Sequence, residues 1–127
     1  MLLSRQNFSI STDTGQDWTD TGPVFSGAVL QVHYIADNGG SPLDTGADLR
    51  IELLQPGDTG ANIQLCKDDN SLGASFNKIY KIYTHDTGGQ VSSEDYLRSR
   101  DGMLRVSVTH DGTGAKKGKL HILTGDI

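Results

Sequence analysis

The chain has 127 residues and a formal net charge of −5 at pH 7, with 11 Lys and Arg against 16 Asp and Glu. This length suits one domain that buries about two-thirds of its unfolded surface, and the acidic balance argues against nucleic acid as a partner, because phosphate groups repel it. The single cysteine, Cys66, excludes an internal disulfide. No apolar run reaches the roughly 18 residues of a membrane span, and the first residues lack the order of a signal peptide. We therefore expect neither a membrane partner nor an export signal.

Alternating apolar and polar residues predict strands through the first half of the chain. Residues 28–35 and 49–54 alternate clearly, and residues 7–12 and 62–67 are weaker candidates. The residues expected to face a core are Leu30, Val32, Tyr34, Leu49, Ile51 and Leu53, and those expected to face outward are Gln31, His33, Arg50 and Glu52. The segment DNGGSPLDTG between the two clear runs is rich in turn-forming residues, so it predicts a loop.

The second half contains the most regular alternation, in residues 104–110, and a similar run in residues 119–123. The residues expected to face inward are Leu104, Val106, Val108, Leu120 and Ile122, and those expected to face outward are Arg105, Ser107, Thr109, Lys119 and His121. A polar segment separates these runs, so they predict a terminal hairpin with a long loop. Residues 76–84 are apolar on both faces, which indicates a strand whose second face meets solvent, a second sheet or another subunit. Residues 92–102 carry helical signals, with serines ahead of acids and Gly102 as a stop, and predict one or two helical turns or a loop.

These runs amount to about seven or eight short strands separated by turn signals, a spacing typical of all-β sandwiches and jelly rolls. Units in which strands alternate with helices would need helical periodicity between the strands. We therefore predict one all-β domain over residues 1–127. Its expected fold is an antiparallel β-sandwich or jelly roll with at most one short helix.

The tripeptide Asp-Thr-Gly recurs in the gaps between apolar runs. Its copies start at Asp13, Asp20, Asp44, Asp58 and Asp86, and a near-copy starts at Asp111. One copy lies in LDTGAD, residues 43–48, which is similar to the catalytic stretch of retroviral-type aspartic proteases. Those enzymes hold the aspartate at the end of a buried strand so that two carboxylates share a proton, whereas NGGSPL precedes Asp44 here and the chain has no Gly-Arg pair. We predict that Asp44 and Gly46 form a turn, that Asp48 leads into a strand, and that the protein is not an enzyme.

No group of residues has the spacing of a metal site. The four histidines are His33, His85, His110 and His121, and no two of them stand at a ligand spacing. His110 and His121 are expected to face each other if the terminal hairpin forms. For the loop of Asp68, Asp69 and Asn70 we prefer a solvated turn, with a calcium site as the alternative. We predict no catalytic, cofactor-binding or metal-binding residues, and no cofactor.

Two further features each allow a structural and a functional interpretation. Lys116 and Lys117 are most simply a solvated loop tip that discourages edge pairing, and the alternative is that they dock onto an acidic surface of a larger assembly. Cys66 is most simply a small core or edge residue, with a redox or cross-linking role as the alternative.

The segment VSVTHDGTGAKKGKLHILTG, residues 106–125, resembles the closing segment of a family of small β-rich proteins from tailed bacteriophages. In that family a short Val-rich strand, a Gly-rich loop with a Lys-x-Gly or Lys-Ser-Gly turn, and a strand of the type Gly-x-Leu-x-Val/Ile-x-Leu end the protein. The residues that occupy this pattern here are Lys117, Gly118, Leu120, Ile122 and Leu123. Further matches are FSGAVLQVHYIAD at residues 25–37, GADLRI at 46–51 and HDTGG at 85–89.

This resemblance implies a virion structural protein, made in the cytoplasm of the bacterial host and located on the capsid surface. The expected role is that of a capsid cement or decoration protein, which binds the major capsid protein on the outside of the head and stabilises the shell as a homo-oligomer, most simply a trimer. The alternatives are a head-tail connector component, or a tail- or fibre-associated module that binds a carbohydrate or receptor. The aromatic residues available for stacking on a sugar are Trp18, Tyr34, Tyr80, Tyr83 and Tyr96.

Overall fold

The computed structural model describes residues 2–14, 16–44, 46–55, 63–68, 72, 74–79, 83–85, 91–94, 98–109 and 114–126. The strands are β1 (Leu3–Thr12), β2 (Trp18–Thr21), β3 (Phe25–Ala36), β4 (Asp48–Leu54), β5 (Ile63–Asp68), β6 (Phe76–Ile79), β7 (Tyr83–His85), β8 (Val91–Glu94), β9 (Arg98–Thr109) and β10 (Lys116–Gly125). Within this described part of the chain no residue is helical, so no helix there is long and apolar enough to cross a membrane.

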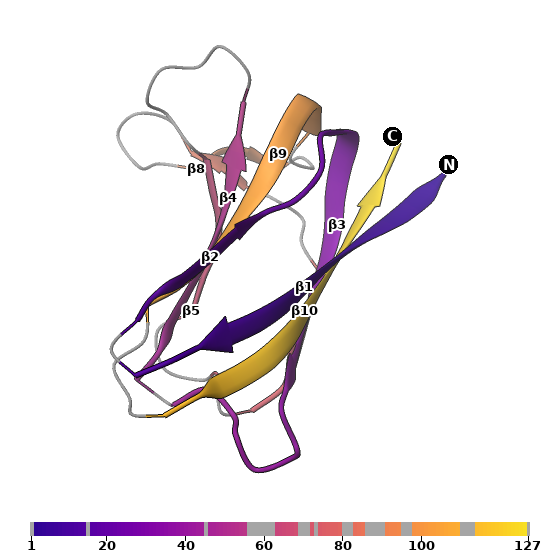
Figure 1. Ribbon diagram of the computed structural model, residues 1–127. Helices are drawn as coiled ribbons and strands as arrows, with labels where there is room; N and C mark the ends of the chain where they lie inside the picture. Colours follow the sequence, from indigo (N-terminus) through magenta and orange to yellow (C-terminus); the bar gives the residue numbers. More distant parts are fainter. Residues whose placement is uncertain are drawn as a thin grey trace.

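Eight of the strands form one antiparallel sheet, in the order β1-β10-β3-β9-β4-β5. Off this path, β2 pairs with β9 and β6 pairs with β3, while β7 and β8 pair with each other. The sheet curls until it is nearly closed, and its shape is barrel-like, not clearly a sandwich or a jelly roll (Figure 1). The prediction of an all-β antiparallel fold is thus confirmed.

The concave side of the sheet holds the hydrophobic core. Its buried residues are Phe8, Ile10, Val29, Val32, Tyr34, Leu43, Ala47, Leu49, Ile51, Leu53, Leu72, Leu104, Val106, Val108, Leu120 and Ile122. The predicted inward residues of β4, β9 and β10 are all among them. In β3 the prediction is wrong at one position, because a bulge opposite Leu123 and Thr124 turns Val29 inward in place of Leu30. The hydroxyl of Tyr34 donates a hydrogen bond to the carbonyl of Leu72 at 2.7 Å, which satisfies the one polar group of this buried side chain.

The two halves of the sheet meet where β3 passes between β9 and β10. Gly27 lies there with a φ of 127°, and a Cβ at this position would come within 2.2 Å of the Gly125 carbonyl oxygen of β10. On the β9 side, Ser99 Oγ donates to the Phe25 carbonyl and accepts from the Gly102 amide, both at 3.0 Å. Only glycine tolerates both this φ and this close approach.

Two predictions from the second half of the chain are wrong. Residues 91–94 and 98–102 belong to strands β8 and β9, so the helical turns or loop predicted over 92–102 are wrong for these residues, and residues 95–97 lie outside the described part. Pairing of Arg98–Gly102 with β3 outweighs the local helical signals, because tertiary contacts override propensity. The runs near residues 104–109 and 119–123 are strands, but they do not form a hairpin, since β9 and β10 pair with opposite edges of β3.

The sheet does not close completely. A cavity of about 580 Å³ lies between β1 and residues 20–26, at the end of the molecule where the two termini lie side by side (Figure 1). The amide of Asp126 donates to the carbonyl of Leu2 at 3.2 Å, so the last described residue is tied to the first. Gln6 Oε1 is buried beside this cavity and has no hydrogen-bond partner among the residues that the structure describes.

Candidate functional site

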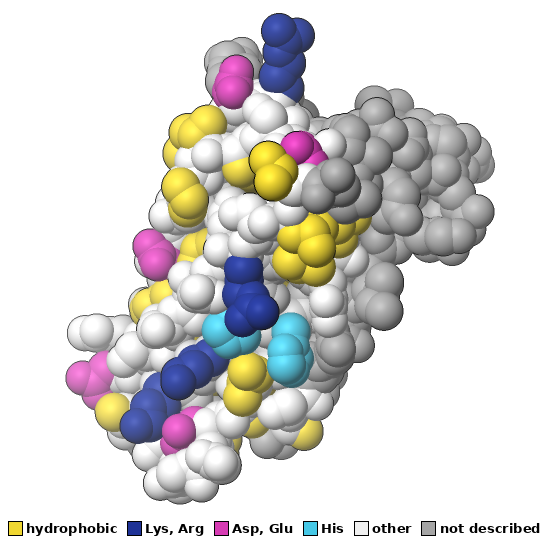
Figure 2. Space-filling model, turned by 90° about the vertical axis from the view of Figure 1, so that its right-hand side faces the viewer, with side chains coloured by type: hydrophobic (Ala, Val, Ile, Leu, Met, Phe, Trp, Pro, Cys, Tyr) yellow, Lys and Arg dark blue, Asp and Glu magenta, His cyan; other side chains and the backbone are white. Residues whose placement is uncertain are grey.

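The outward side chains of β1, β10 and β3 form a continuous surface that we call the basic face. Its residues are Leu3, Arg5, Asn7, Ser9, Ser11, Gln31, His33, Ile35, Lys117, Lys119, His121 and Leu123. They lie outside because each alternates with a core residue along its strand. None of them is Asp or Glu, although the chain as a whole has a net charge of −5. Figure 2 shows the result, a diagonal row of Lys and Arg side chains with two histidines in its middle.

Strand register brings the ionisable groups of this face together. Asn7 of β1 and His33 of β3 both stand opposite His121 of β10. The rings of His33 and His121 have their centroids 6.3 Å apart and are tilted by 48°. Nδ1 of His121 lies within hydrogen-bond distance of Asn7 Oδ1, and a ring that donates from Nδ1 leaves Nε2 as the nitrogen that takes up a proton.

The environment of His121 favours its neutral form. Its pKa is lowered from the usual 6.5, first because partial burial desolvates the ring, and then because of the positive charges of Arg5, His33 and Lys119. Every charge that acts on the ring is thus cationic. A negative group placed here would be attracted by Arg5 and would reverse the effect on His121.

Two hollows mark the basic face. The smaller has a volume of about 210 Å³ and is lined by Arg5, Gln31, His33, His121 and Leu123. The larger, of about 400 Å³, lies farther along β10, between Ser9 and Ser11 on one side and Ile35 and Asp37 on the other, with Lys117 and Lys119 along it. Asp37 belongs to the loop after β3, where its Oδ2 accepts a hydrogen bond from the Ser41 amide at 3.0 Å.

The other cations with described side chains divide between paired and open positions. Arg105 Nη2 lies 3.0 Å from Glu52 Oε1 on the opposite surface of the sheet. Lys116 Nζ lies 3.6 Å from Asp44 Oδ1. By contrast, Arg5, Lys117 and Lys119 form no ion pair with any described residue. The exposed Arg50 and Arg100, away from the basic face, form none either. The two lysines that the sequence suggested as one docking tip therefore separate, with Lys116 half-buried beside Asp44 and Lys117 on the basic face.

The LDTGAD segment lies in the loop before β4. The amide of Ala47 donates to the carbonyl of Asp44 at 3.0 Å, which closes the predicted turn, and β4 begins at Asp48 as expected. A similar turn follows Asp13, whose carbonyl accepts from the Gln16 amide at 3.0 Å. The copies at Asp58, Asp86 and Asp111 lie outside the described residues.

The histidine and metal hypotheses have different outcomes. His121 faces His33 and Asn7, and His110 lies outside the described residues, so the expected His110–His121 contact is not tested. Asp68 ends β5, while Asp69 and Asn70 are not described, which leaves the calcium alternative open. Among residues 2–126 with described side chains, no three His, Cys, Asp or Glu side chains are grouped as metal ligands would be. Cys66 lies in β5, and nothing is described of its side chain.

The structure describes the side chains of two of the five aromatic residues that could stack on a sugar. Tyr34 is fully buried and so has no ring face open to a ligand, while Trp18 is partly buried and packs against the core. The side chains of Tyr80, Tyr83 and Tyr96 lie outside the described part, and the same holds for the two-faced character of residues 76–84.

On the basic face, Arg5, Lys117 and Lys119 form no ion pair with a residue that the structure describes. Comparisons of the chain with protein-family models, with curated proteins and with solved structures find no match.

Proposed function

We propose that this protein is a structural protein of a tailed-bacteriophage virion, and specifically a cement protein that binds the outer surface of the head. The observation that carries the proposal is the resemblance of residues 25–37, 46–51 and 106–125 to small β-rich phage proteins. The strands that contain these segments, β3, β4, β9 and β10, are neighbours in the order β10-β3-β9-β4. Their adjacency supports the proposal, because segments far apart in the sequence belong to one continuous piece of sheet.

The geometry of the described chain fits such a role. A cement protein stabilises a shell through shallow contacts repeated at symmetry-related sites, and it acts by binding the assembled state in preference to the free subunits. The basic face offers a broad sheet surface of this kind, made from three adjacent strands. Even weak individual contacts become effective when they are repeated over a lattice.

The partner in this proposal is the major capsid protein, and the protein itself is a homo-oligomer, most simply a trimer suited to three-fold positions of the shell. It is made in the host cytoplasm and ends on the capsid surface, with no nucleic acid, membrane or cofactor involved. Two packed layers, as in a sandwich or jelly roll, remain our proposal for the finer arrangement of the strands.

The test is reconstitution on purified expanded heads that lack the protein. We expect binding to saturate at a copy number close to that of the capsid subunits, and we expect decorated heads to rupture at a higher temperature than bare heads. Copy number is measured by quantitative mass spectrometry of sedimented particles, and rupture by the loss of sedimenting heads after heating. A handful of copies per particle, or binding to host glycans without binding to heads, would contradict the proposal.

A further inference from the structure

We propose that the basic face docks onto a carboxylate-rich protein surface, and that the hollow of Arg5, His33 and His121 receives a carboxylate of that partner. Identifying the partner as the head surface rests on the proposed function. The chemistry of the site does not, because it follows from the charges and distances of the face itself.

The basic face gathers cations that no described acid neutralises. Arg5, Lys117 and Lys119 have no acidic partner among the described residues, and strand pairing gathers them on one surface. Of the other cations with described side chains, Arg105 and Lys116 each have an acidic partner, while Arg50 and Arg100 have none among the described residues. In a chain with more Asp and Glu than Lys and Arg, the outward positions of these three strands hold no carboxylate, and Asp37 in the loop after β3 is the acid that lines the larger hollow beside Lys117 and Lys119. The end of the face around Arg5 therefore keeps a local positive potential. Such a potential attracts anionic groups and orients a partner before contact.

The smaller hollow of the basic face has a size and lining that suit one side chain. The hollow of about 210 Å³ is lined by one permanent cation, two imidazoles, the amide of Gln31 and the apolar Leu123. A guanidinium binds a carboxylate through two parallel hydrogen bonds, and imidazole N–H groups donate to its remaining lone pairs. The apolar side chain fits the stem of an Asp or Glu side chain. The hollow therefore suits a carboxylate carried on a side chain.

Docking of a carboxylate changes the protonation of His121. The charged groups that face His121 are Arg5 from β1, Lys119 from its own strand and His33 from β3, and no described carboxylate faces it. A bound carboxylate would oppose these cations and raise the pKa of His121, so docking takes up a proton. By linkage, docking then tightens as the pH falls through the range in which His121 titrates.

The composition of the basic face fits a protein partner better than a nucleic acid. Nucleic-acid sites need many cations against a dense row of phosphates, and this face has three permanent cations on a chain of net charge −5. It also carries Ile35, Leu123 and several hydroxyl and amide groups, a mixture usual in protein interfaces. Strands of 10 to 12 residues rise about 3.3 Å per residue, and three of them about 4.8 Å apart cover a few hundred Å², less than the roughly 800 Å² per partner of a stable single interface. Repetition of acidic sites on the partner therefore strengthens docking.

The experiment uses a paired set of charge reversals. Arg5→Glu with Lys119→Glu changes the basic face, and Arg50→Glu with Arg100→Glu changes two exposed cations outside it, so that both variants go from net charge −5 to −9. Poly-L-glutamate is the probe for the isolated protein, with oligothymidylate as the phosphate probe. We expect poly-L-glutamate to shift the NMR signals of Arg5, His33, His121 and Lys119, with affinity about tenfold lower in the basic-face variant and little changed in the control.

Two further readouts belong to the same experiment. The pKa of His121 is expected to rise on binding, and the affinity for poly-L-glutamate is expected to rise as the pH falls between this raised pKa and the lowered pKa of the free protein. Equal loss in both variants, no shift on the basic face, or tighter binding of oligothymidylate there would each overturn the proposal. If the double reversal does not fold, Arg5→Gln with Lys119→Gln replaces it, and the mapping on the unmodified protein stands on its own.

Binding to the purified heads tests the docking surface and the cement role separately. Binding of unmodified protein to heads with no loss in the basic-face variant overturns the docking surface and leaves the cement role intact. Binding of poly-L-glutamate to the basic face without any binding to heads supports the site and contradicts the cement role.

Discussion

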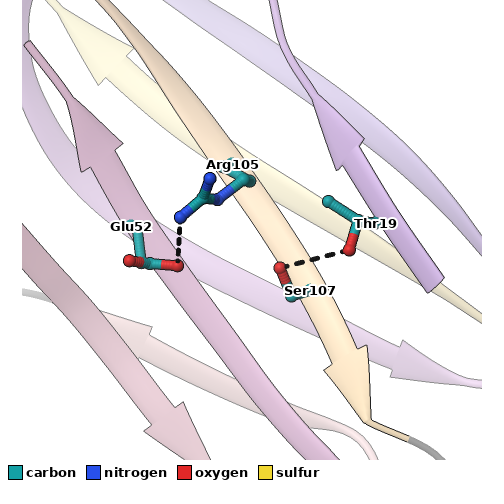
Figure 3. A network of polar contacts seen from close by, with 4 residues as sticks. All are labelled: Thr19, Glu52, Arg105 and Ser107. Carbon is teal, nitrogen blue, oxygen red and sulfur yellow. Dashed lines mark hydrogen bonds and ion pairs between the residues drawn. The ribbon is translucent and has the colours of Figure 1, made fainter. Parts of the chain in front are cut away.

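The two outer surfaces of the curved sheet treat charge in opposite ways. On the side of β2, β9 and β4, Arg105 pairs with Glu52 at 3.0 Å, and the hydroxyls of Thr19 and Ser107 lie 3.5 Å apart (Figure 3). We call this surface the mixed face. On the basic face, the cations Arg5 and Lys119 have no such partner. The same two-residue alternation builds both surfaces, but among the described residues the one ion pair across neighbouring strands lies on the mixed face, where Arg50 is still unpaired.

This difference bears on function because opposite charges across neighbouring strands stabilise a sheet and like charges destabilise it. The mixed face follows this rule. The basic face departs from it around His121, where all neighbouring charges are positive. Local departures of this kind are expected at functional sites, where a binding surface needs charges that the fold itself would prefer to neutralise.

The largest effect is expected from breaking the junction of the two halves, on which both faces depend. Gly27→Ala should lower the free energy of unfolding by about 3–5 kcal/mol, because the new Cβ would meet the Gly125 carbonyl oxygen at 2.2 Å. Gly40→Ala is the matched control, since Gly40 has a φ of 98° and no atom within 4 Å of a Cβ. It should cost only the strain of that backbone, about 1–2 kcal/mol. Urea unfolding measures both, and equal losses would show that the contact with β10 is unimportant.

The sequence predicts the strands well because their apolar residues repeat every second position. Leu104, Val106 and Val108 face the core as expected, as do the predicted inward residues of β4 and β10. Leu30 fails because a bulge shifts the alternation by one residue, and bulges leave no clear signal in a single sequence. Pairing order is also hidden from the sequence. Two consecutive strands joined by a polar loop look like a hairpin, whereas β3 lies between β9 and β10.

The basic face was missed for the same reason. Its outward residues could be recognised strand by strand, and Lys119, His121 and His33 were predicted to face outward. Their convergence with Arg5 depends on β10 lying between β1 and β3, which links residues more than one hundred positions apart in sequence. A useful signal was available in the composition of these three runs, which together hold cations and no acids in outward positions.

The second effect comes from giving the basic face the neutralisation that the mixed face already has. Ser9 stands opposite Lys119 in the register of β1 and β10, and both side chains are exposed. Ser9→Glu should raise the free energy of unfolding by about 0.2–1 kcal/mol through a cross-strand ion pair. The same change should weaken docking to a carboxylate-rich partner. Thermal unfolding and binding to poly-L-glutamate measure the two effects in one preparation.

A matched control places the same pair on the mixed face. Ser107 stands opposite Arg50 in the register of β9 and β4, so Ser107→Glu also adds one carboxylate beside one cation. It should stabilise the fold by a similar amount and leave docking unchanged. If Ser9→Glu binds as tightly as Ser107→Glu, the basic face is not the docking surface.

A smaller effect is expected from the ion pair of the mixed face itself. The side chains of Arg105 and Glu52 are 35% and 22% exposed, so water screens much of their attraction. A double-mutant cycle with Arg105→Gln and Glu52→Gln should give a coupling energy of about 0.2–1 kcal/mol. None of the three variants should alter docking. A coupling well above this range would mean that the mixed face stabilises the fold more strongly than a surface pair can.

The smallest effect is the pH dependence that His121 gives to folding. Its pKa is lowered from 6.5 in the folded protein by desolvation and by the cations around it. The unfolded chain therefore binds this proton more readily than the folded one, and stability that is fully present above pH 6.5 is lost as the pH falls toward the lowered pKa. His121→Gln should reduce this loss, as seen by urea unfolding at a series of pH values, while an NMR titration reports the pKa directly. A carboxylate polymer bound to the basic face should have the opposite influence and stabilise the protonated ring. A ring that titrates above 6.5 in the free protein, or an unchanged pH dependence in the variant, would mean that the basic face exerts no positive field on His121.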